Sequence, residues 1–181
     1  MVQNTRNRIL NSAECVALRD GVAHLTLDAV AAEAGLSKGG ILYNYPNKDA
    51  LVRGMVHRLI EQTESEIARL AEADPEPRGR LVRAYIRVTF PEDGTVPARV
   101  NQIAAVLLTA ILTNSSLLEP ARQHFLSMQQ RLLNDGLDDR IVHIIRLAAD
   151  GLWLSEMLQM PGPIGELRTS IIRQLIEMTR R

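Results

Sequence analysis

Apolar residues recur along most of this chain with the three- and four-residue spacing of amphipathic α-helices. In the first such stretch, residues 5–19, the apolar face is formed by Ile9, Ala13, Val16 and Ala17. The chain has no useful run of alternating apolar and polar residues and no Asn-Gly hairpin turn, so strands are not expected. The pattern predicts an all-α fold of about nine helices.

Helix-capping residues divide the region after the first helix into short segments. Thr26 precedes "LDAVAAEAG" and is predicted to cap a second helix that ends at Gly35. Ser37 is predicted to cap a short third helix, which Pro46 ends. Asn47 is then the expected cap of a long fourth helix. These caps therefore predict two short helices in close succession, followed by a long one.

Composition and charge narrow the class of protein. Of the 181 residues, 46% are hydrophobic, which is enough for a core. The 21 basic and 21 acidic residues cancel, so a surface for nucleic acid must be a local patch. Cys15 is the one cysteine, which fits a reducing compartment. The longest apolar stretch, residues 103–112, is about half the length needed to span a bilayer. We expect a soluble, cytoplasmic protein.

The segment "LTLDAVAAEAGLSKGGILYNYPNKDAL" has the layout of a helix-turn-helix, whose second helix enters the DNA major groove. Gly39 and Gly40 leave backbone unshielded in the first turn of that helix and would allow close approach to DNA. The phenol of Tyr43 and the amine of Lys38 would contact phosphate. The full set of predicted DNA contacts comprises Thr26, Ser37, Lys38, Gly39, Gly40, Tyr43, Asn44, Lys48, Arg6 and Arg8.

Each of these residues also has a purely structural interpretation. Thr26 and Ser37 are explained by capping alone, and Lys48 by an ordinary solvated surface position. Arg6 and Arg8 are predicted to lie before the first helix is established, where they would reach phosphate or remain disordered. Two further side chains of the third helix, Leu42 and Tyr45, are predicted to belong to the core. The charged residues of the first fifty positions cancel, so binding requires the basic side chains to gather on one face.

Residues 9–51 closely resemble the DNA-binding region of TetR-family transcriptional repressors. The matching elements are the Ile-Leu start, the glycine that ends the first helix, "TLDAVA", "AGLSKG", "LY" and "NKDAL". Family members commonly have Thr or Ala in place of Gly40, and His-Phe in place of Asn44 and Tyr45. The resemblance implies about nine helices, a homodimer, an effector-binding C-terminal domain and release from DNA when ligand binds.

This resemblance predicts a helix-turn-helix domain at residues 1–50 and a helical effector-binding and dimerisation domain at residues 51–181. A dimer would place two recognition helices about one DNA turn apart on a palindromic operator. The last two helices carry apolar faces and small residues that permit close approach, so they are the expected interface. Its predicted residues are Ile141, Ile145, Ala148, Leu152, Leu167, Ile171, Leu175 and Met178.

The C-terminal domain is also expected to hold a ligand pocket. Most of the aromatic residues outside the DNA-binding segment occur there, together with methionines that adapt to varied ligands. The predicted lining comprises Ile103, Leu107, Ile111, Phe125, Met128, Trp153, Met157 and Phe90. The alternative interpretation is that each of these side chains belongs to the hydrophobic core and lines no pocket. A pocket of this composition would take a small hydrophobic effector.

Two other functions are alternatives to a ligand-responsive repressor. An enzyme is not expected, because the four histidines are scattered and no zinc-protease, nucleophile-elbow or phosphate-loop motif occurs. No metal site or cofactor is expected either. The second alternative is a helical interaction protein that has this fold but has lost specific DNA binding.

Overall fold

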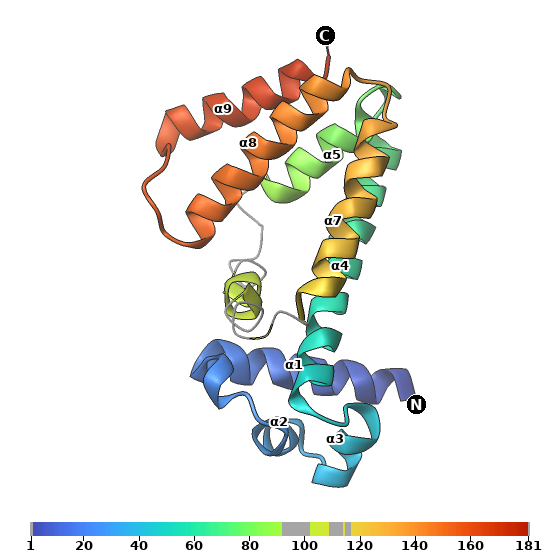
Figure 1. Ribbon diagram of the computed structural model, residues 1–181, viewed down its shortest axis with the longest axis vertical. Helices are drawn as coiled ribbons and strands as arrows, with labels where there is room; N and C mark the ends of the chain where they lie inside the picture. Colours follow the sequence, from blue (N-terminus) through green and yellow to red (C-terminus); the bar gives the residue numbers. More distant parts are fainter. Residues whose placement is uncertain (1, 92–101, 109–113, 115–116, 181) are drawn as a thin grey trace. The chain divides into compact units, whose positions relative to one another are not determined.

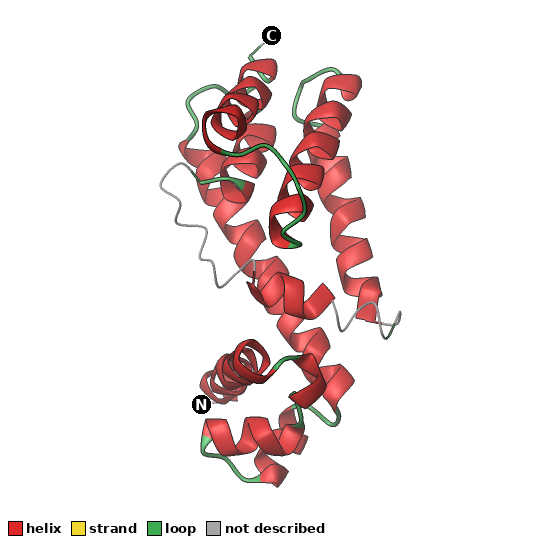
Figure 2. Ribbon diagram, turned by 90° about the vertical axis from the view of Figure 1, so that its left-hand side faces the viewer, coloured by secondary structure: helices red, strands yellow, loops and turns green. Residues whose placement is uncertain are grey.

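The computed structural model describes residues 2–91, 102–108, 114 and 117–180. Within these residues the chain is helical and contains no strand, which confirms the predicted all-α class (Figure 2). Residues 102–108 are also helical. None of the helices in the described part is both long and apolar enough to cross a membrane. The other helices are α1 (Val2–Asp20), the 3₁₀ helix η1 (Val22–His24), α2 (Leu27–Ala34), α3 (Lys38–Asn44), α4 (Lys48–Ala73), α5 (Arg80–Thr89), α7 (Leu118–Leu133), α8 (Asp139–Met157) and α9 (Gly165–Met178) (Figure 1).

The chain forms two compact units. The first comprises Met1–Ile60 with Gln102–Gln123, and the second comprises Glu61–Asn101 with His124–Arg181. The long helix α4 runs through the division between Ile60 and Glu61. The functional boundary placed after residue 50 stays a prediction.

The caps predicted for the first unit are present. The Thr26 hydroxyl accepts a hydrogen bond from the Ala29 amide at 3.1 Å, and the Ser37 hydroxyl accepts one from the Gly40 amide at 3.1 Å. The Asn47 side chain likewise accepts from the Ala50 amide at 2.8 Å. Between α2 and α3, Gly35 has φ 59° and ψ 40°, the left-handed conformation that glycine adopts without strain. Local sequence therefore determines where these helices begin and end.

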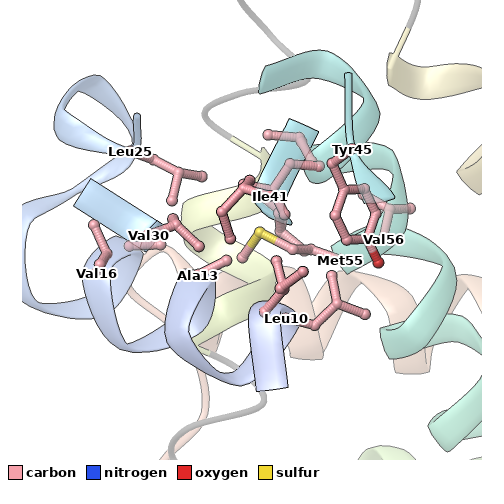
Figure 3. Packing of buried hydrophobic residues seen from close by; sticks show 14 of the residues in the cluster. Leu10, Ala13, Val16, Leu25, Val30, Ile41, Tyr45, Met55 and Val56 are labelled. Atoms are coloured by element: carbon pink, nitrogen blue, oxygen red, sulfur yellow. The ribbon is translucent and has the colours of Figure 1, made fainter. Parts of the chain in front are cut away.

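The core of the first unit is built from α1, α2, α3 and the start of α4. Figure 3 shows its side chains converging from these helices, with Met55 of α4 near the middle. Ile103 and Leu107, from the helical residues 102–108, belong to the same buried cluster. The cluster consists of Ile9, Leu10, Ala13, Val16, Ala17, Leu25, Val30, Ala31, Ala34, Ile41, Tyr45, Leu51, Val52, Met55, Val56, Ile103, Leu107 and Leu117.

In the second unit, α5, α8 and α9 pack against one another (Figure 1). Its buried cluster includes Ile145, Leu152 and Leu175, which are 0%, 7% and 5% exposed. The prediction that these three side chains form a dimer interface is wrong, because they fill the core of their own chain. Periodicity located these helices but did not distinguish their inward from their outward face.

A buried arginine connects three segments of the second unit through hydrogen bonds. Arg83 of α5 is 1% exposed and donates to both carboxylate oxygens of Asp74, at 2.8 and 3.0 Å. It also donates to the carbonyl of Arg78 at 2.9 Å and to the hydroxyl of Thr179 at 3.3 Å. One side chain thus joins the segment after α4, the helix α5 and the end of α9.

Candidate nucleic-acid interface

Two inward-pointing side chains hold α3 against the first unit. Ile41 and Tyr45, four residues apart, are 0% and 3% exposed, and both pack in the core (Figure 3). The Tyr45 ring lies against the backbone of α4 at Gly54, where an added Cβ would be 2.7 Å from Tyr45 Cε1. The guanidinium of Arg6 lies over the same ring, 5.4 Å from its centroid. The orientation of α3 is thereby fixed, and its opposite face is left to solvent.

That outward face carries Tyr43 and Leu42, which are 85% and 40% exposed. The prediction that Leu42 belongs to the core is wrong. Leu42 follows Ile41 by about 100° around the helix, so it lies at the edge of the inward face and its side chain is partly exposed. Tyr43 is placed as expected, with its phenol available to a partner, and its phosphate contact stays a prediction.

Packing among the described residues requires neither of the paired glycines, Gly39 and Gly40. Neither has a positive φ, so neither backbone conformation requires glycine. A Cβ added at Gly39 would have Ser37 Oγ as its nearest neighbour, at 3.9 Å, and one at Gly40 would meet the same atom at 3.5 Å. Both are ordinary contacts, so alanine would fit in the free protein. Neither glycine is therefore explained by steric crowding among the described residues.

The basic side chains near α3 already have partners in the chain. Lys38 forms an ion pair with Asp28 at 3.0 Å, and both side chains are largely exposed. Lys48 is half-buried and donates to the carbonyl of Val22 at 2.6 Å, so it is not the ordinary solvated lysine of the alternative interpretation. Each amine still has two further donors for phosphate, since an ammonium group has three.

Arg6 and Arg8 are helical, although they were predicted to lie before the first helix is established. Helix α1 begins at Val2, so both arginines are part of an established helix rather than of a segment before it. Arg8 donates to the carbonyl of Gly35 at 3.4 Å, a weak contact that joins α1 to the turn of the helix-turn-helix. The amide of Asn44 donates to the carbonyl of Gly40 at 2.9 Å, within α3 itself. Their contacts with DNA stay predictions.

The residues predicted to line a ligand pocket do not belong to one cluster. Ile103 and Leu107 are buried in the core of the first unit, and Phe90 and Met128 in that of the second. Phe125 is 45% exposed, while Trp153 and Met157 are half-buried. Ile111 lies outside the described residues.

A surface groove of about 590 Å³ lies in the first unit and is polar. Its lining therefore does not resemble the predicted apolar pocket. It is lined by Asn4, Asn7, Arg8, Asn11, Ser12, Ala32, Glu33, Ala34 and Gly35.

The second unit contains a polar cluster that the sequence did not reveal. The phenol of Tyr85 in α5 donates to Asp150 of α8, and Arg146 lies 3.4 Å from the same carboxylate. Arg146 also lies over the ring of Phe125 in α7, 5.5 Å from its centroid. Burial, followed by the charge of Asp150, raises the pKa of Tyr85 well above its usual range, so the phenol remains a neutral donor. Because 65 positions separate Tyr85 from Asp150, no local pattern could have paired them.

A three-helix unit that presents α3 behind a glycine turn, followed by a second helical unit, defines a helix-turn-helix protein. Residues 79–180 match the family model described as "Tetracyclin repressor-like, C-terminal domain", and residues 9–55 match "Bacterial regulatory proteins, tetR family". The chain belongs to the TetR family. Its members are regulatory proteins and not enzymes, which agrees with the function expected from the sequence.

Individual relatives support the assignment. The "HTH-type transcriptional regulator TtgR" of Pseudomonas putida is 32% identical over 107 residues, which are 58% of this chain and 50% of that protein. The "HTH-type transcriptional regulator EthR" of Mycolicibacterium smegmatis is 27% identical over 90 residues, 50% of this chain and 42% of that protein. The chain thus spans about half the length of the curated relatives it matches.

Solved structures share the fold over nearly the whole chain. A member of the TetR family from Streptomyces coelicolor A3 has a TM-score of 0.71 and 24% identity, covering 97% of this chain and 98% of that one. The multidrug binding protein EbrR complexed with imidazole has a TM-score of 0.68 and 24% identity, covering 96% of this chain and 89% of that one. At this identity the likeness establishes the fold.

Proposed function

We propose that this protein is a dimeric transcriptional regulator that binds operator DNA through α2 and α3 and is released by a small effector. The observation that carries the proposal is the exposed face of α3, where Tyr43 is 85% exposed and Gly39 is not required by packing among the described residues. A helix-turn-helix presents this face to the major groove. The alternative, an interaction protein that has lost DNA binding, gives no reason for a glycine there, since glycine costs helix stability.

The proposed dimer would form through the outward faces of α8 and α9. Leu147 of α8 is 73% exposed and Leu167 of α9 is 61% exposed. Ile144 and Leu154 extend the same apolar surface on α8, at 52% and 37% exposed. Exposed apolar residues gathered on two helices are typical of a protein interface, and TetR-family regulators act as dimers. These side chains therefore replace the buried ones in the predicted interface.

A Leu147→Glu variant is expected to be monomeric, because a dimer would have to bury the new carboxylate in an apolar contact. Sedimentation velocity measures the change, with the wild type sedimenting as a dimer at the same concentration. Leu126→Glu on α7 is the matched control, because Leu126 is also exposed, at 55%, and lies outside α8 and α9. A dimeric Leu147→Glu protein would place the interface elsewhere.

We propose that the effector is small and largely apolar and binds in the second unit. Trp153 and Met157 lie one helical turn apart on α8, where both are half-buried. Tyr85 and Asp150 add a hydrogen-bonding pair in the same unit. Release would follow if the effector binds a conformation whose recognition helices no longer match the groove spacing.

The function is tested by titrating the purified chain against duplexes selected from a random library, at several salt concentrations. We expect selected sites to be palindromic and the logarithm of the binding constant to fall linearly with that of salt concentration. Absence of salt-sensitive binding to every duplex would reject the regulator and favour the interaction protein.

Lys48→Ala is expected to weaken binding to all duplexes alike and to reduce the salt slope by about one phosphate contact. The reason is that the Lys48 amine, held at 2.6 Å from the Val22 carbonyl, is positioned at the start of α4 beside α3. The slope is obtained from the same salt titrations. Arg140→Ala removes one exposed positive charge from α8 and should leave the slope unchanged. A wild-type slope for Lys48→Ala would argue against the phosphate contact.

A further inference from the structure

The first unit exposes large apolar side chains at the recognition helix. Between residues 4 and 60, all of which the structure describes, Leu42 and Tyr43 are the large hydrophobic residues with exposed side chains. Everywhere else in that range such residues are buried or half-buried. An exposed leucine next to an exposed tyrosine, on the helix that enters the groove, calls for an apolar partner.

The same helix is poor in side chains that read bases by hydrogen bonding. Guanine is usually read by Arg or Lys, and adenine by Asn or Gln. In α3 the candidates are Lys38, which forms an ion pair with Asp28, and Asn44, whose amide donates to the carbonyl of Gly40. Arginine and glutamine do not occur in α3. Hydrogen-bonded readout from this helix is therefore limited.

The glycine in the first turn brings the apolar pair closer to the bases. Gly39 precedes Leu42 by three residues and Tyr43 by four, so it lies beside both on the surface of α3. A Cβ there would make one ordinary contact, with Ser37 Oγ at 3.9 Å, so the chain itself leaves room for it. Without that Cβ, the helix can lie deeper in the groove, where Leu42 and Tyr43 reach the edges of base pairs.

We propose that this chain recognises thymine by the C5-methyl group, through the Leu42 side chain and the edge of the Tyr43 ring. In the major groove this methyl is the apolar group that distinguishes A·T from G·C pairs. The inference rests on the proposed function and specifies the kind of operator: half-sites whose central readout is thymine, recognised by apolar contact. The Tyr43 hydroxyl remains available to phosphate.

The test replaces single thymines by deoxyuridine in the selected operator. This removes the methyl group and preserves base pairing. We expect about a fourfold loss of affinity for each methyl contact that is removed, from the free energy of burying one such group. Thymines outside the half-sites serve as controls and should be replaceable without effect. Binding is followed by fluorescence anisotropy at one fixed salt concentration.

Protein variants assign the contact to its side chain. Leu42→Asn keeps the number and branching of the side-chain heavy atoms and removes the apolar surface, so this variant should bind the thymine and deoxyuridine operators equally. Leu42→Met retains an apolar side chain and should retain the preference. Tyr43→Phe should bind both operators more weakly by the same factor, because it keeps the ring and removes only the hydroxyl.

Each outcome has a distinct meaning. If the wild type binds selected DNA in a salt-sensitive way but tolerates deoxyuridine at every position, methyl readout is overturned and the regulator stands. The same holds if selection returns half-sites without thymine. If Leu42→Asn keeps the preference, the methyl group is read by another side chain, and the assignment to Leu42 is overturned. If the chain binds no duplex, both proposals fail together.

Discussion

An Arg83→Ala variant is expected to lose about 3–5 kcal/mol of unfolding free energy, the usual cost of removing one partner of a buried ion pair. Arg83 and Asp74 have side chains that are 1% and 5% exposed, so water cannot replace the missing guanidinium. The carboxylate would keep Arg87, at 3.2 Å, as a partner. The carbonyl of Arg78 and the hydroxyl of Thr179 would lose the donor that joins them.

Urea denaturation followed by circular dichroism measures the loss. Arg140→Ala is the matched control, because Arg140 forms an ion pair with Asp138 at a distance of 2.8 Å but is 87% exposed. Exposed pairs contribute little, so the control should unfold at the wild-type midpoint. An Arg83→Ala protein as stable as the control would show that the buried network does not hold the second unit together.

The same network predicts how stability depends on pH. Hydrogen bonds from Arg83 lower the pKa of Asp74 from 3.8 to about 2. A carboxylate with a lowered folded-state pKa stabilises the protein above its unfolded pKa, and that contribution disappears as pH falls through the folded value. We therefore expect the wild type to lose roughly 2 kcal/mol between about pH 4 and pH 2 from this group. In Arg83→Ala this part of the pH dependence should be smaller.

Local signals in the sequence were sufficient to predict the helix-turn-helix. Caps at Thr26, Ser37 and Asn47 act within three residues, so sequence alone locates them. The glycine turn at Gly35 is equally local. The first helix was expected from residue 5, whereas α1 begins at Val2, so Arg6 and Arg8 lie well inside an established helix. Residues 2–8 contain a single apolar residue, Val2, and so offer no apolar periodicity with which to extend the helix.

Faces and long-range partners were harder to predict, for a physical reason. Helix α8 is apolar on two sides, with Ile145 buried and the adjacent Ile144 exposed. Hydropathy cannot tell a side that fills the chain's own core from a side left for a partner. The contact between Tyr85 and Asp150 depends on how helices pack and leaves no periodic signal. Leu42, in contrast, could have been placed outward from the spacing of Ile41 and Tyr45.

Gly39→Ala is expected to stabilise the protein and to weaken its binding to DNA by at least about tenfold, a change of roughly 1.4 kcal/mol. Alanine is favoured over glycine in a helix by up to about 1 kcal/mol, and here its Cβ meets no atom closer than 3.9 Å. The unfolding free energy of the free protein should therefore increase. In the complex the same methyl group would stand between α3 and the floor of the groove, and would lift Leu42 and Tyr43 away from the bases.

Gly40→Ala is the matched control, one residue along the same helix. Its Cβ would meet Ser37 Oγ at 3.5 Å and Leu36 Cβ at 3.9 Å, whereas a Cβ at Gly39 would meet Ser37 Oγ alone, at 3.9 Å. The two variants should gain similar stability, measured by urea denaturation, because both replace glycine in the first turn of α3. Their affinities for the operator should differ, with Gly40→Ala close to the wild type.

Opposite changes in stability and affinity would separate a binding requirement from a folding requirement. If Gly39→Ala binds as tightly as Gly40→Ala, close approach of the backbone is not the reason for the glycine. If both variants are destabilised, the first turn of α3 is under a constraint that its unstrained backbone and open surroundings do not reveal. Only loss of affinity at Gly39, with stability raised at both positions, supports a recognition helix that gives up helix propensity for depth in the groove.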